Sequence, residues 1–294
     1  MKLDYKIIWV EDKIDTKPFQ SLKKKIKNHL ENEFFNVTID TAEDYKEFKA
    51  KYEETDTFDL IITDLNLNES HGSEVIDFVR DEKHILTEIF FYSANSELSS
   101  TQLANNSRIT FYQLDGQDYH KELQKSIIQL IDLTISKFHH IVTMRGMIMH
   151  ETSDLDVSIQ EILKLIIENG DSEAILNVIK KKKIKSTNEF LKKKIDQSQD
   201  LDDFLQNIGA DHRLRGLIRN IPKDEIQNKL AKYKSEIIDV RNQFAHASLD
   251  LENNTFKTKD GKEFNQALCK KIRKDINEHI LNINALRDKL ATTI

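Results

Sequence analysis

The sequence is poor in residues that interrupt or cross-link a chain. Its 294 residues include seven glycines, two prolines and a single cysteine, Cys269. So few turn-forming residues predict long helices and strands joined by few irregular loops. A single thiol cannot form a disulfide within the chain, so we expect a protein that works in the reducing cytoplasm.

Long apolar runs and a secretion signal are also missing. No stretch approaches the roughly 18 consecutive apolar residues of a membrane-spanning helix, so we expect no membrane insertion. The first apolar run, Tyr5 to Val10, is short and leads directly into acidic residues, unlike a signal peptide. With 38% hydrophobic and 32% charged residues, the composition is that of a globular protein. The length predicts about two domains.

Charge is unevenly distributed along the chain. Residues 1–120 contain 14 basic and 24 acidic residues, a net charge of −10, whereas the remainder contains 30 basic and 26 acidic residues, a net charge of +4. An acidic first half and a mildly basic second half suit a regulatory domain joined to a module that meets phosphate groups. The imbalance alone does not indicate nucleic-acid binding, and no basic recognition helix or helix-turn-helix pattern points to DNA.

Short apolar runs alternate with amphipathic stretches in the first part of the chain. The predicted strands are residues 5–10, 37–39, 58–63, 88–92 and 109–114, and the predicted helices between them are residues 17–34, 44–53 and 73–80. Continuously apolar strands separated by helices indicate a parallel sheet that is covered on both faces. We therefore expect an α/β domain with a doubly wound, five-stranded parallel sheet.

Polar residues follow several of the predicted strands. Glu11 and Asp12 follow the first strand, Asp64 ends the third and Ser93 ends the fourth. The carboxyl ends of parallel strands lie at one edge of the sheet, where ligands gather. Three carboxylates at one place repel each other and favour a divalent cation, and oxygen ligands suit Mg²⁺. A carboxylate beside such a metal is also prepared to accept a phosphoryl group. The alternative is a surface cluster of acids without a metal.

These residues resemble the receiver domain of two-component response regulators, and Gly72 matches the glycine that opens the helix after the third strand. The resemblance implies a CheY-like, flavodoxin-like fold for residues 1–122. It also implies that Asp64 is the phospho-acceptor, that Ser93 senses the phosphate, and that a cognate sensor kinase or another regulatory protein is a partner. The metal ligands that it implies are three carboxylates and one backbone carbonyl: Glu11, Asp12, Asp64 and Asn66.

One residue of the receiver pattern is missing. The family places a lysine, usually before a proline, at the end of the fifth strand, where it clamps the phosphoryl group. This chain has neither residue between Gln113 and Gln117, and the nearest basic residue, Lys121, falls inside the next predicted helix. The aromatic switch position is occupied, by Phe111 or Tyr112. Phosphorylation and a phosphate-independent pseudo-receiver therefore both stay open.

The pattern is helical from about residue 117 onward. Apolar residues recur every three or four positions, which predicts a helical connector over residues 123–150. A short loop at residues 152–156 then opens an all-α domain, residues 151–294. Its main predicted helices are residues 155–167, 201–208, 214–218, 223–247 and 264–290. A hairpin is predicted at residues 251–264, with its turn at Lys259-Asp260-Gly261.

The long predicted helix ends in a motif with the chemistry for RNA cleavage. It contains Arg241, Asn242 and His246, and two further Arg-to-His pairs at similar spacing show that the spacing alone is unspecific. An imidazole can move a proton on or off a ribose hydroxyl, and a guanidinium can stabilise charge on the phosphoryl group. His246 is therefore the candidate acid–base residue, Arg241 the phosphate clamp and Asn242 the residue that orients them. No metal is required.

This motif resembles the signature of the HEPN family, small helical bundles whose Arg-polar-x-x-x-His pattern marks many metal-independent endoribonucleases. The resemblance implies a HEPN-like bundle in residues 151–294, RNA as the substrate, and a homodimer that brings two copies of the motif together. It also suggests a setting such as phage defence or stress signalling. The alternative is a non-catalytic signalling or dimerisation module, in which Arg241 lies on the surface and His246 is satisfied by a backbone carbonyl.

Overall fold

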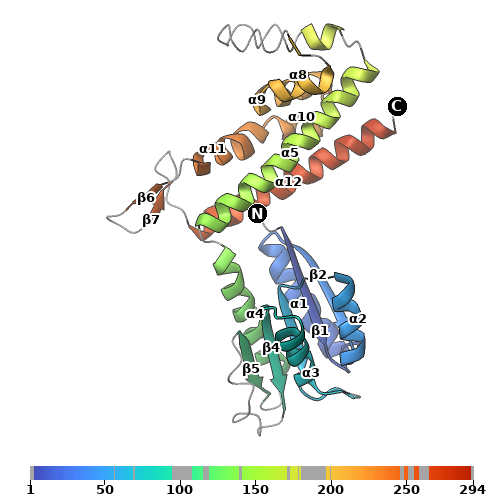
Figure 1. The fold of residues 1–294 in the computed structure, drawn as a ribbon, viewed down its shortest axis with the longest axis vertical. Coiled ribbons are helices and arrows are strands. Elements are labelled where there is room, and N and C mark those ends of the chain that lie inside the picture. Colours follow the sequence, from blue (N-terminus) through green and yellow to red (C-terminus); the bar gives the residue numbers. More distant parts are fainter. Residues whose placement is uncertain are drawn as a thin grey trace. The chain divides into compact units, whose positions relative to one another are not determined.

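The computed structural model describes most of the chain (Figure 1): residues 3–55, 57–68, 70–94, 108–114, 119–138, 141–170, 173–177, 179, 197–198, 200–245, 248–250, 255–257 and 265–292. The chain divides into two compact units, Lys2–His140 and Ile141–Ile294. This division falls inside residues 123–150, the predicted helical connector. The first unit is α/β and the second is mainly helical, which confirms the predicted fold class.

A five-stranded sheet forms the centre of the first unit. Its strands are β1 (Asp4–Val10), β2 (Asn36–Ala42), β3 (Leu60–Asp64), β4 (Glu88–Ser93) and β5 (Ile109–Gln113). All neighbouring strands are parallel, in the order β2-β1-β3-β4-β5. The order changes direction at β1, which lies between β2 and β3, and ligands of such sheets bind beyond the strand ends at this point.

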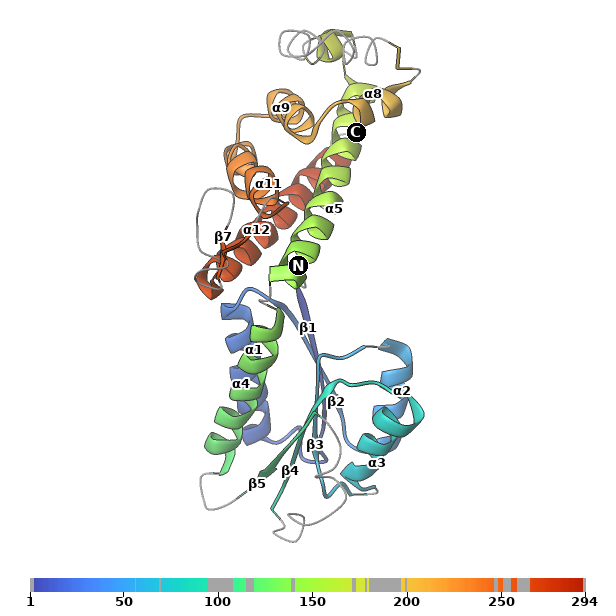
Figure 2. The same cartoon turned by 60° about the vertical axis from the view of Figure 1, so that its left-hand side comes forward.

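Helices cover both faces of this sheet (Figure 2). On one face lie α1 (Lys17–Asn32) and α4 (Tyr119–Phe138); on the other lie α2 (Tyr45–Thr55), α3 (Gly72–Asp77) and the π-helical turn η1 (Phe78–Glu82). Successive strand residues point to opposite faces. Trp9 therefore packs in the core under α1 and α4, whereas Val10 packs in the core under α2 and α3. Because both faces are buried, the central strands β1, β3 and β4 are apolar over most of their length, whereas the edge strand β2 contains several polar residues.

The second unit is built around two long helices, α5 (Ile141–Asn169) and α12 (Gln266–Ala291), which pack against each other. Shorter elements pack on them: α8 (Leu201–Asn207), α9 (Ala210–Asn220), α10 (Glu225–Leu230), the π-helical turn η4 (Lys234–Ile238) and α11 (Asp239–Ala245). Within the described residues, no helix has the length and apolarity needed to cross a bilayer.

The loop predicted at residues 152–156 is wrong, because α5 runs through it without interruption. The hydroxyl of Thr152 donates to the carbonyl of Ile148 at 2.7 Å, and that of Ser153 donates to Met149 at 2.7 Å. The polar residues that suggested a turn are therefore satisfied inside the helix. Leu155 continues the buried apolar stripe of α5.

The segment predicted as one helix over residues 223–247 is divided. It consists of α10, the π-helical turn η4 and α11. The hairpin that follows has short antiparallel strands, β6 (Ser248–Asp250) and β7 (Thr255–Lys257), so their connection is residues 251–254. The predicted turn at residues 259–261 lies outside the described residues.

Candidate functional site

Three carboxylates meet at the carboxyl edge of the sheet in the first unit. Glu11 and Asp12 follow β1 and Asp64 ends β3, and one oxygen from each lies within 4.8 Å of the others. The two strands are direct neighbours, with Val10 paired to Thr63. The strand ends therefore carry the three acids to the same place, as the sequence predicted.

Glu11 is the most deeply buried of these acids, with a residue exposure of 1%. The hydroxyl of Tyr92 donates to Glu11 Oε2 at 2.5 Å, and the backbone N–H of Lys13 donates to Oε1 at 3.0 Å. The indole N–H of Trp9 donates to the Tyr92 oxygen at 3.0 Å. Burial raises the pKa of Glu11 to about 7; the hydrogen bond from Tyr92 and the Lys13 N–H oppose this shift, whereas Asp12 and the charge of Asp64 add to it. Tyr92 was not predicted as a site residue, because its position in an apolar strand is typical of a core aromatic.

Asp64 is partly buried beside this pair. Burial raises its pKa to about 6; the backbone N–H groups of Leu65 and Asn66 oppose the shift, and the charge of Asp12 adds to it. The Asn66 N–H donates weakly to Asp64 Oδ1, at 3.4 Å, and the Asn66 side-chain amide donates to Ser93 Oγ at 3.4 Å. Asn66 therefore lies between the predicted phospho-acceptor and the predicted phosphate-sensing hydroxyl.

The donor atoms of this cluster suit a magnesium ion. All are carboxylate oxygens, the hard ligands that Mg²⁺ prefers. Among the described residues, Asp12 Oδ1 is buried and has no hydrogen-bond partner. A buried oxygen without a partner is costly unless it binds a cation or water. Glu11, Asp12 and Asp64 therefore fit the predicted ion, and the contribution of the Asn66 carbonyl stays a prediction.

Among the described residues at the end of β5, none places a cation next to Ser93. Gln113 pairs with Ser93 in the sheet register, and the N–H of Leu114 donates to the Ser93 carbonyl at 2.7 Å. The two aromatic candidates for the switch position lie on opposite faces of the sheet. Tyr112 stacks on Phe90 in the core under α1 and α4, whereas Phe111 is 36% exposed on the face of α2 and α3.

Comparison with known proteins gives matches only among solved structures: no family model and no curated protein matches the chain. A response regulator receiver domain protein from Clostridium thermocellum is 18% identical, and the match covers 44% of this chain and 94% of that one with a TM-score of 0.32. The chemotaxis response regulator CheY4 of Vibrio cholerae is 24% identical, with 43% and 98% covered and a TM-score of 0.32. A CheY-like receiver domain from Methylobacillus flagellatus is 18% identical, with 44% and 98% covered and a TM-score of 0.30.

Lys2–His140 has the CheY-like receiver fold. The strand order, the parallel pairing and the two helix layers establish this from the structure itself. We call these residues the receiver unit. At the same edge of its sheet, the backbone of Gly72 approaches that of Asp64: the Gly72 N–H donates to the Leu65 carbonyl at 2.8 Å, and a Cβ on Gly72 would lie 2.1 Å from the Asp64 carbonyl oxygen.

Gly72→Ala should therefore destabilise the receiver unit. The obstructing atom is backbone, which cannot move away as a side chain can, so we expect a loss of about 3 kcal/mol in the free energy of unfolding. Urea unfolding followed by the fluorescence of Trp9, the single tryptophan, reports on this unit. Gly146→Ala is the control, because no atom lies within 4 Å of the added Cβ. An unchanged midpoint for Gly72→Ala would show that the close approach to Asp64 is not rigid.

The raised pKa of Glu11 predicts a pH-dependent stability. The folded state holds this proton more tightly than the unfolded state, whose pKa is 4.5. The stability that the protonated Glu11 side chain gives the folded state is fully present below pH 4.5. It is lost as the pH rises through about 7 and the side chain ionises. In chelator, Glu11→Gln should match the parent at pH 4.5 and exceed its unfolding free energy by about 2 kcal/mol at pH 8. Urea unfolding at both values tests this, with the exposed Glu54→Gln as control; equal gains at both pH values would contradict it.

In the second unit, Arg241 lies on α11 and is joined to α5. Its Nη1 donates to Asp156 Oδ2 at 2.6 Å, and the two side chains are 20% and 13% exposed. Asn242 is exposed. His246 lies outside the described residues, so the structure places two of the three predicted catalytic residues. This ion pair was not predicted from the sequence, because Asp156 and Arg241 are 85 positions apart.

A buried tyrosine lies in the same region. Tyr233 is fully buried, and among the described residues its hydroxyl has no hydrogen-bond partner. Burial and the charge of Asp156 raise its pKa, whereas Arg241 and Arg213 act in the opposite direction. Arg213 Nη1 donates to the carbonyl of Leu205 at 3.0 Å. Charged side chains from α5, α9 and α11 therefore all act on the neutral phenol of Tyr233.

The other two Arg-to-His pairs have different environments. Arg273 and His279 are buried on α12, where His279 Nε2 lies 2.8 Å from Glu236 Oε2. This pair belongs to the core of the unit and is not open to a polynucleotide. His150 is exposed on α5 and lies 3.6 Å from Asp154. Neither environment resembles that of Arg241, which pairs with a mostly buried carboxylate in the middle of another helix, α5.

Proposed function

We propose that this chain is a receiver-regulated endoribonuclease, in which an input at Asp64 controls metal-independent RNA cleavage by the helical unit. The observation that carries the first half is the meeting of Glu11, Asp12 and Asp64 at the carboxyl edge of a receiver fold. The orphaned Asp12 oxygen supports a cation there. The input is phosphorylation by a sensor kinase or the docking of another regulatory protein.

In the phosphorylation reaction, an Asp64 carboxylate oxygen attacks the phosphorus of the donor. A bond forms between that oxygen and phosphorus, the bond to the donor breaks, and the donor leaves with its electron pair. Mg²⁺, when bound, offsets the negative charge of the phosphoryl oxygens and the carboxylates. Ser93, which accepts from the Asn66 amide, is proposed to donate its hydroxyl proton to a phosphoryl oxygen. This hydroxyl then reports the modification to β4 and its neighbours.

The direct experiment is incubation of the full chain with acetyl phosphate and Mg²⁺, followed by intact-mass spectrometry. One added phosphoryl group supports the proposal. If neither acetyl phosphate nor a phosphorylated histidine donor transfers a phosphoryl group, the unit is a pseudo-receiver, and partner docking is its only input. The neutral end of β5 is the observation that favours this alternative.

The second half of the proposal depends on Arg241. An arginine has five N–H donors, and Asp156 accepts from one nitrogen at 2.6 Å. The ion pair therefore fixes the guanidinium while further N–H groups remain for a phosphate. In the proposed reaction His246 moves the proton of the ribose 2′-hydroxyl, Arg241 stabilises the charged phosphoryl group, and Asn242 orients them. A homodimer would supply two such motifs to a shared site.

The competing function is a non-catalytic signalling or dimerisation module. It is favoured by the low exposure of Arg241, 20%, which also suits an ion pair that only joins two helices. Incubation of the purified protein with total RNA in excess chelator separates the two functions. RNA fragments ending in a 2′,3′-cyclic phosphate support the nuclease, whereas intact RNA supports the module.

A further inference from the structure

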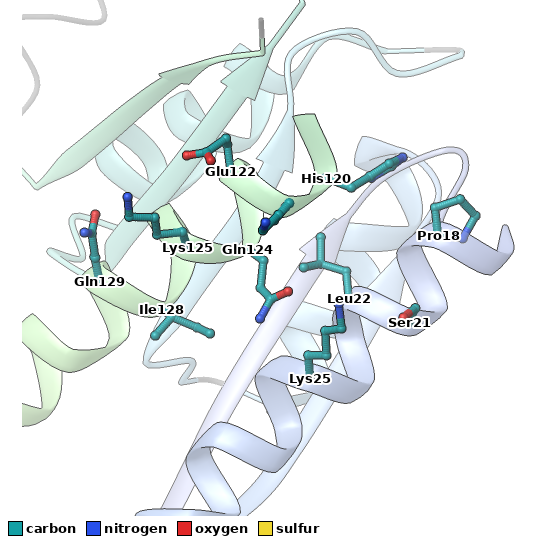
Figure 3. Close-up of a pocket in the computed structure, with 11 residues that line it drawn as sticks. Pro18, Ser21, Leu22, Lys25, His120, Glu122, Gln124, Lys125, Ile128 and Gln129 are labelled. Atoms are coloured by element: carbon teal, nitrogen blue, oxygen red, sulfur yellow. The ribbon is translucent and has the colours of Figure 1, made fainter. Parts of the chain in front are cut away.

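A groove of about 660 Å³ lies between α1 and α4 of the receiver unit (Figure 3). It is lined by the first turns of both helices, and its floor includes Leu22 and Ile128. Its size falls within the roughly 300–1,000 Å³ of small-molecule sites. Both helix N-termini lie along it, and the partial positive charge of a helix N-terminus favours an anion. None of the acids at the sheet edge lines it.

Three lysines line this groove: Lys25 on α1, and Lys121 and Lys125 on α4. Their side chains are exposed, and within the described residues none forms an ion pair or a hydrogen bond. Five other lysines of the receiver unit have carboxylate partners: Lys27, Lys49, Lys51, Lys83 and Lys137. Within the described residues, no ion pair is formed by Lys6, Lys13, Lys17, Lys23, Lys24 and Lys46, so the groove differs in that three unpaired lysines line one space.

These three lysines lie in an acidic part of the chain, because residues 1–140 contain 17 basic and 26 acidic residues, a net charge of −9. Carboxylates are plentiful in this part of the chain. Among the described residues that line the groove, however, one is a carboxylate, Glu122, and three are lysines. Unpaired cations from two facing helices make a local positive field in an acidic domain. Such a field attracts an anion rather than another part of the same unit.

One polar atom at the groove also lacks a partner. His120 Nδ1 is buried and makes no hydrogen bond within the described residues. The ring of His120 packs edge-on against Phe19, with the centroids 5.1 Å apart. Burial lowers the pKa of His120, so the ring is neutral at physiological pH. Because Nδ1 is closed to solvent, a ligand in the groove would meet the other ring nitrogen, Nε2, which can donate or accept a hydrogen bond.

We propose that this groove binds a phosphate-bearing ligand with a flat heterocyclic ring, of the mononucleotide class. The ring packs over Leu22 and Ile128 and forms a hydrogen bond with His120. The phosphates lie between Lys25 and Lys125, which come from opposite walls. The apolar floor selects against free phosphate, and the lysines select against an uncharged ring. The proposal concerns a second site and does not depend on phosphorylation of Asp64.

Trp9 provides a built-in readout of this site. Its ring contacts Phe19 edge-on, with the centroids 6.0 Å apart, and Phe19 in turn contacts His120. The single tryptophan is therefore two ring contacts away from the groove. A ligand that reorders His120 should change the fluorescence of Trp9.

The experiment titrates the full chain with ATP in excess chelator, followed by Trp9 fluorescence and by calorimetry. We expect saturable binding with one ATP per chain. Lys25→Glu with Lys125→Glu should weaken the affinity by about tenfold or more, because two charge-assisted contacts are lost. The matched control is Lys24→Glu, an exposed lysine next to Lys25 that does not line the groove. Circular dichroism checks that each variant is folded.

Three results would overturn the proposal. The first is the absence of saturable ATP binding by the folded parent protein. The second is equal binding of inorganic triphosphate and ATP, which would show that the groove does not bind the heterocyclic ring. The third is equal weakening by Lys24→Glu, which would show general attraction to a basic helix. If the double variant is unfolded, Lys25→Ala and Lys125→Ala, measured singly, replace it.

Discussion

Asp64→Asn is expected to abolish phosphoryl uptake by the chain, with a loss of at least about a hundredfold in the rate of labelling by acetyl phosphate. The reason is chemical, since a neutral amide is a poor nucleophile and cannot form the acyl phosphate. The geometry is otherwise preserved, because Asn has the shape of Asp and can accept from the same Leu65 and Asn66 N–H groups. Intact-mass spectrometry followed by peptide mapping measures the labelling and locates the phosphoryl group.

Two controls make this result specific. Asp81→Asn changes an exposed aspartate away from the sheet edge and should label like the parent. Removal of Mg²⁺ by chelator should reduce labelling of the parent as strongly as the Asp64 substitution does, because three carboxylates within 4.8 Å otherwise repel the incoming phosphate. Labelling of the Asp64→Asn chain at the parent's rate would assign the acceptor to another residue.

His246→Ala is expected to abolish RNA cleavage, with a loss of at least about a hundredfold, the usual contribution of an acid–base group. Arg241→Lys should cause a comparable loss, because a lysine keeps the charge opposite Asp156 but lacks the planar fork that binds a phosphate. We prefer this change to Arg241→Ala, which would leave Asp156 without its ion-pair partner. The Asp156 side chain is 13% exposed, and an unpaired carboxylate this deeply buried would destabilise the fold. Cleavage is measured on total RNA in chelator, with the cyclic phosphate ends counted.

The matched control is His150→Ala, which removes the histidine of another Arg-to-His pair. That histidine is exposed on α5 and should leave cleavage unchanged. Full activity of a folded His246→Ala chain would reject the assigned acid–base residue. Loss of activity in the His150→Ala chain alone would instead assign the motif to the other pair, Arg145 and His150.

The receiver sheet could be predicted because its strands are buried on both faces. Continuous apolar runs such as residues 60–63 are unusual outside parallel sheets, and the acids directly after them mark one edge. The hydrogen bonds around Glu11 could not be predicted. Trp9 and Tyr92 are 83 positions apart, and they meet because both strands neighbour β3 and present these residues on the same face. This contact depends on the strand register, which cannot be read from the sequence.

The helical unit was harder to predict for a related reason. Thr152 and the polar residues after it are typical of a turn, but their hydroxyls bond within α5, and the apolar stripe of that helix continues. The Asp156–Arg241 ion pair joins elements that are 85 positions apart. Periodicity predicts which face of a helix is buried, but not which polar residue of another helix it meets.

The π-helical turn Lys234–Ile238 affects where this unit can tolerate the deletion of a residue. Such turns hold one residue more than an α-helix needs for the same rise. Deleting that residue would restore ordinary winding and leave the residues beyond it, Arg241 among them, facing nearly the same way. Deleting Val240 from the α-helical part that follows would instead rotate everything beyond it by about 100° and turn Arg241 away from Asp156. We therefore expect the unit to tolerate loss of one residue within Lys234–Ile238 better than loss of Val240.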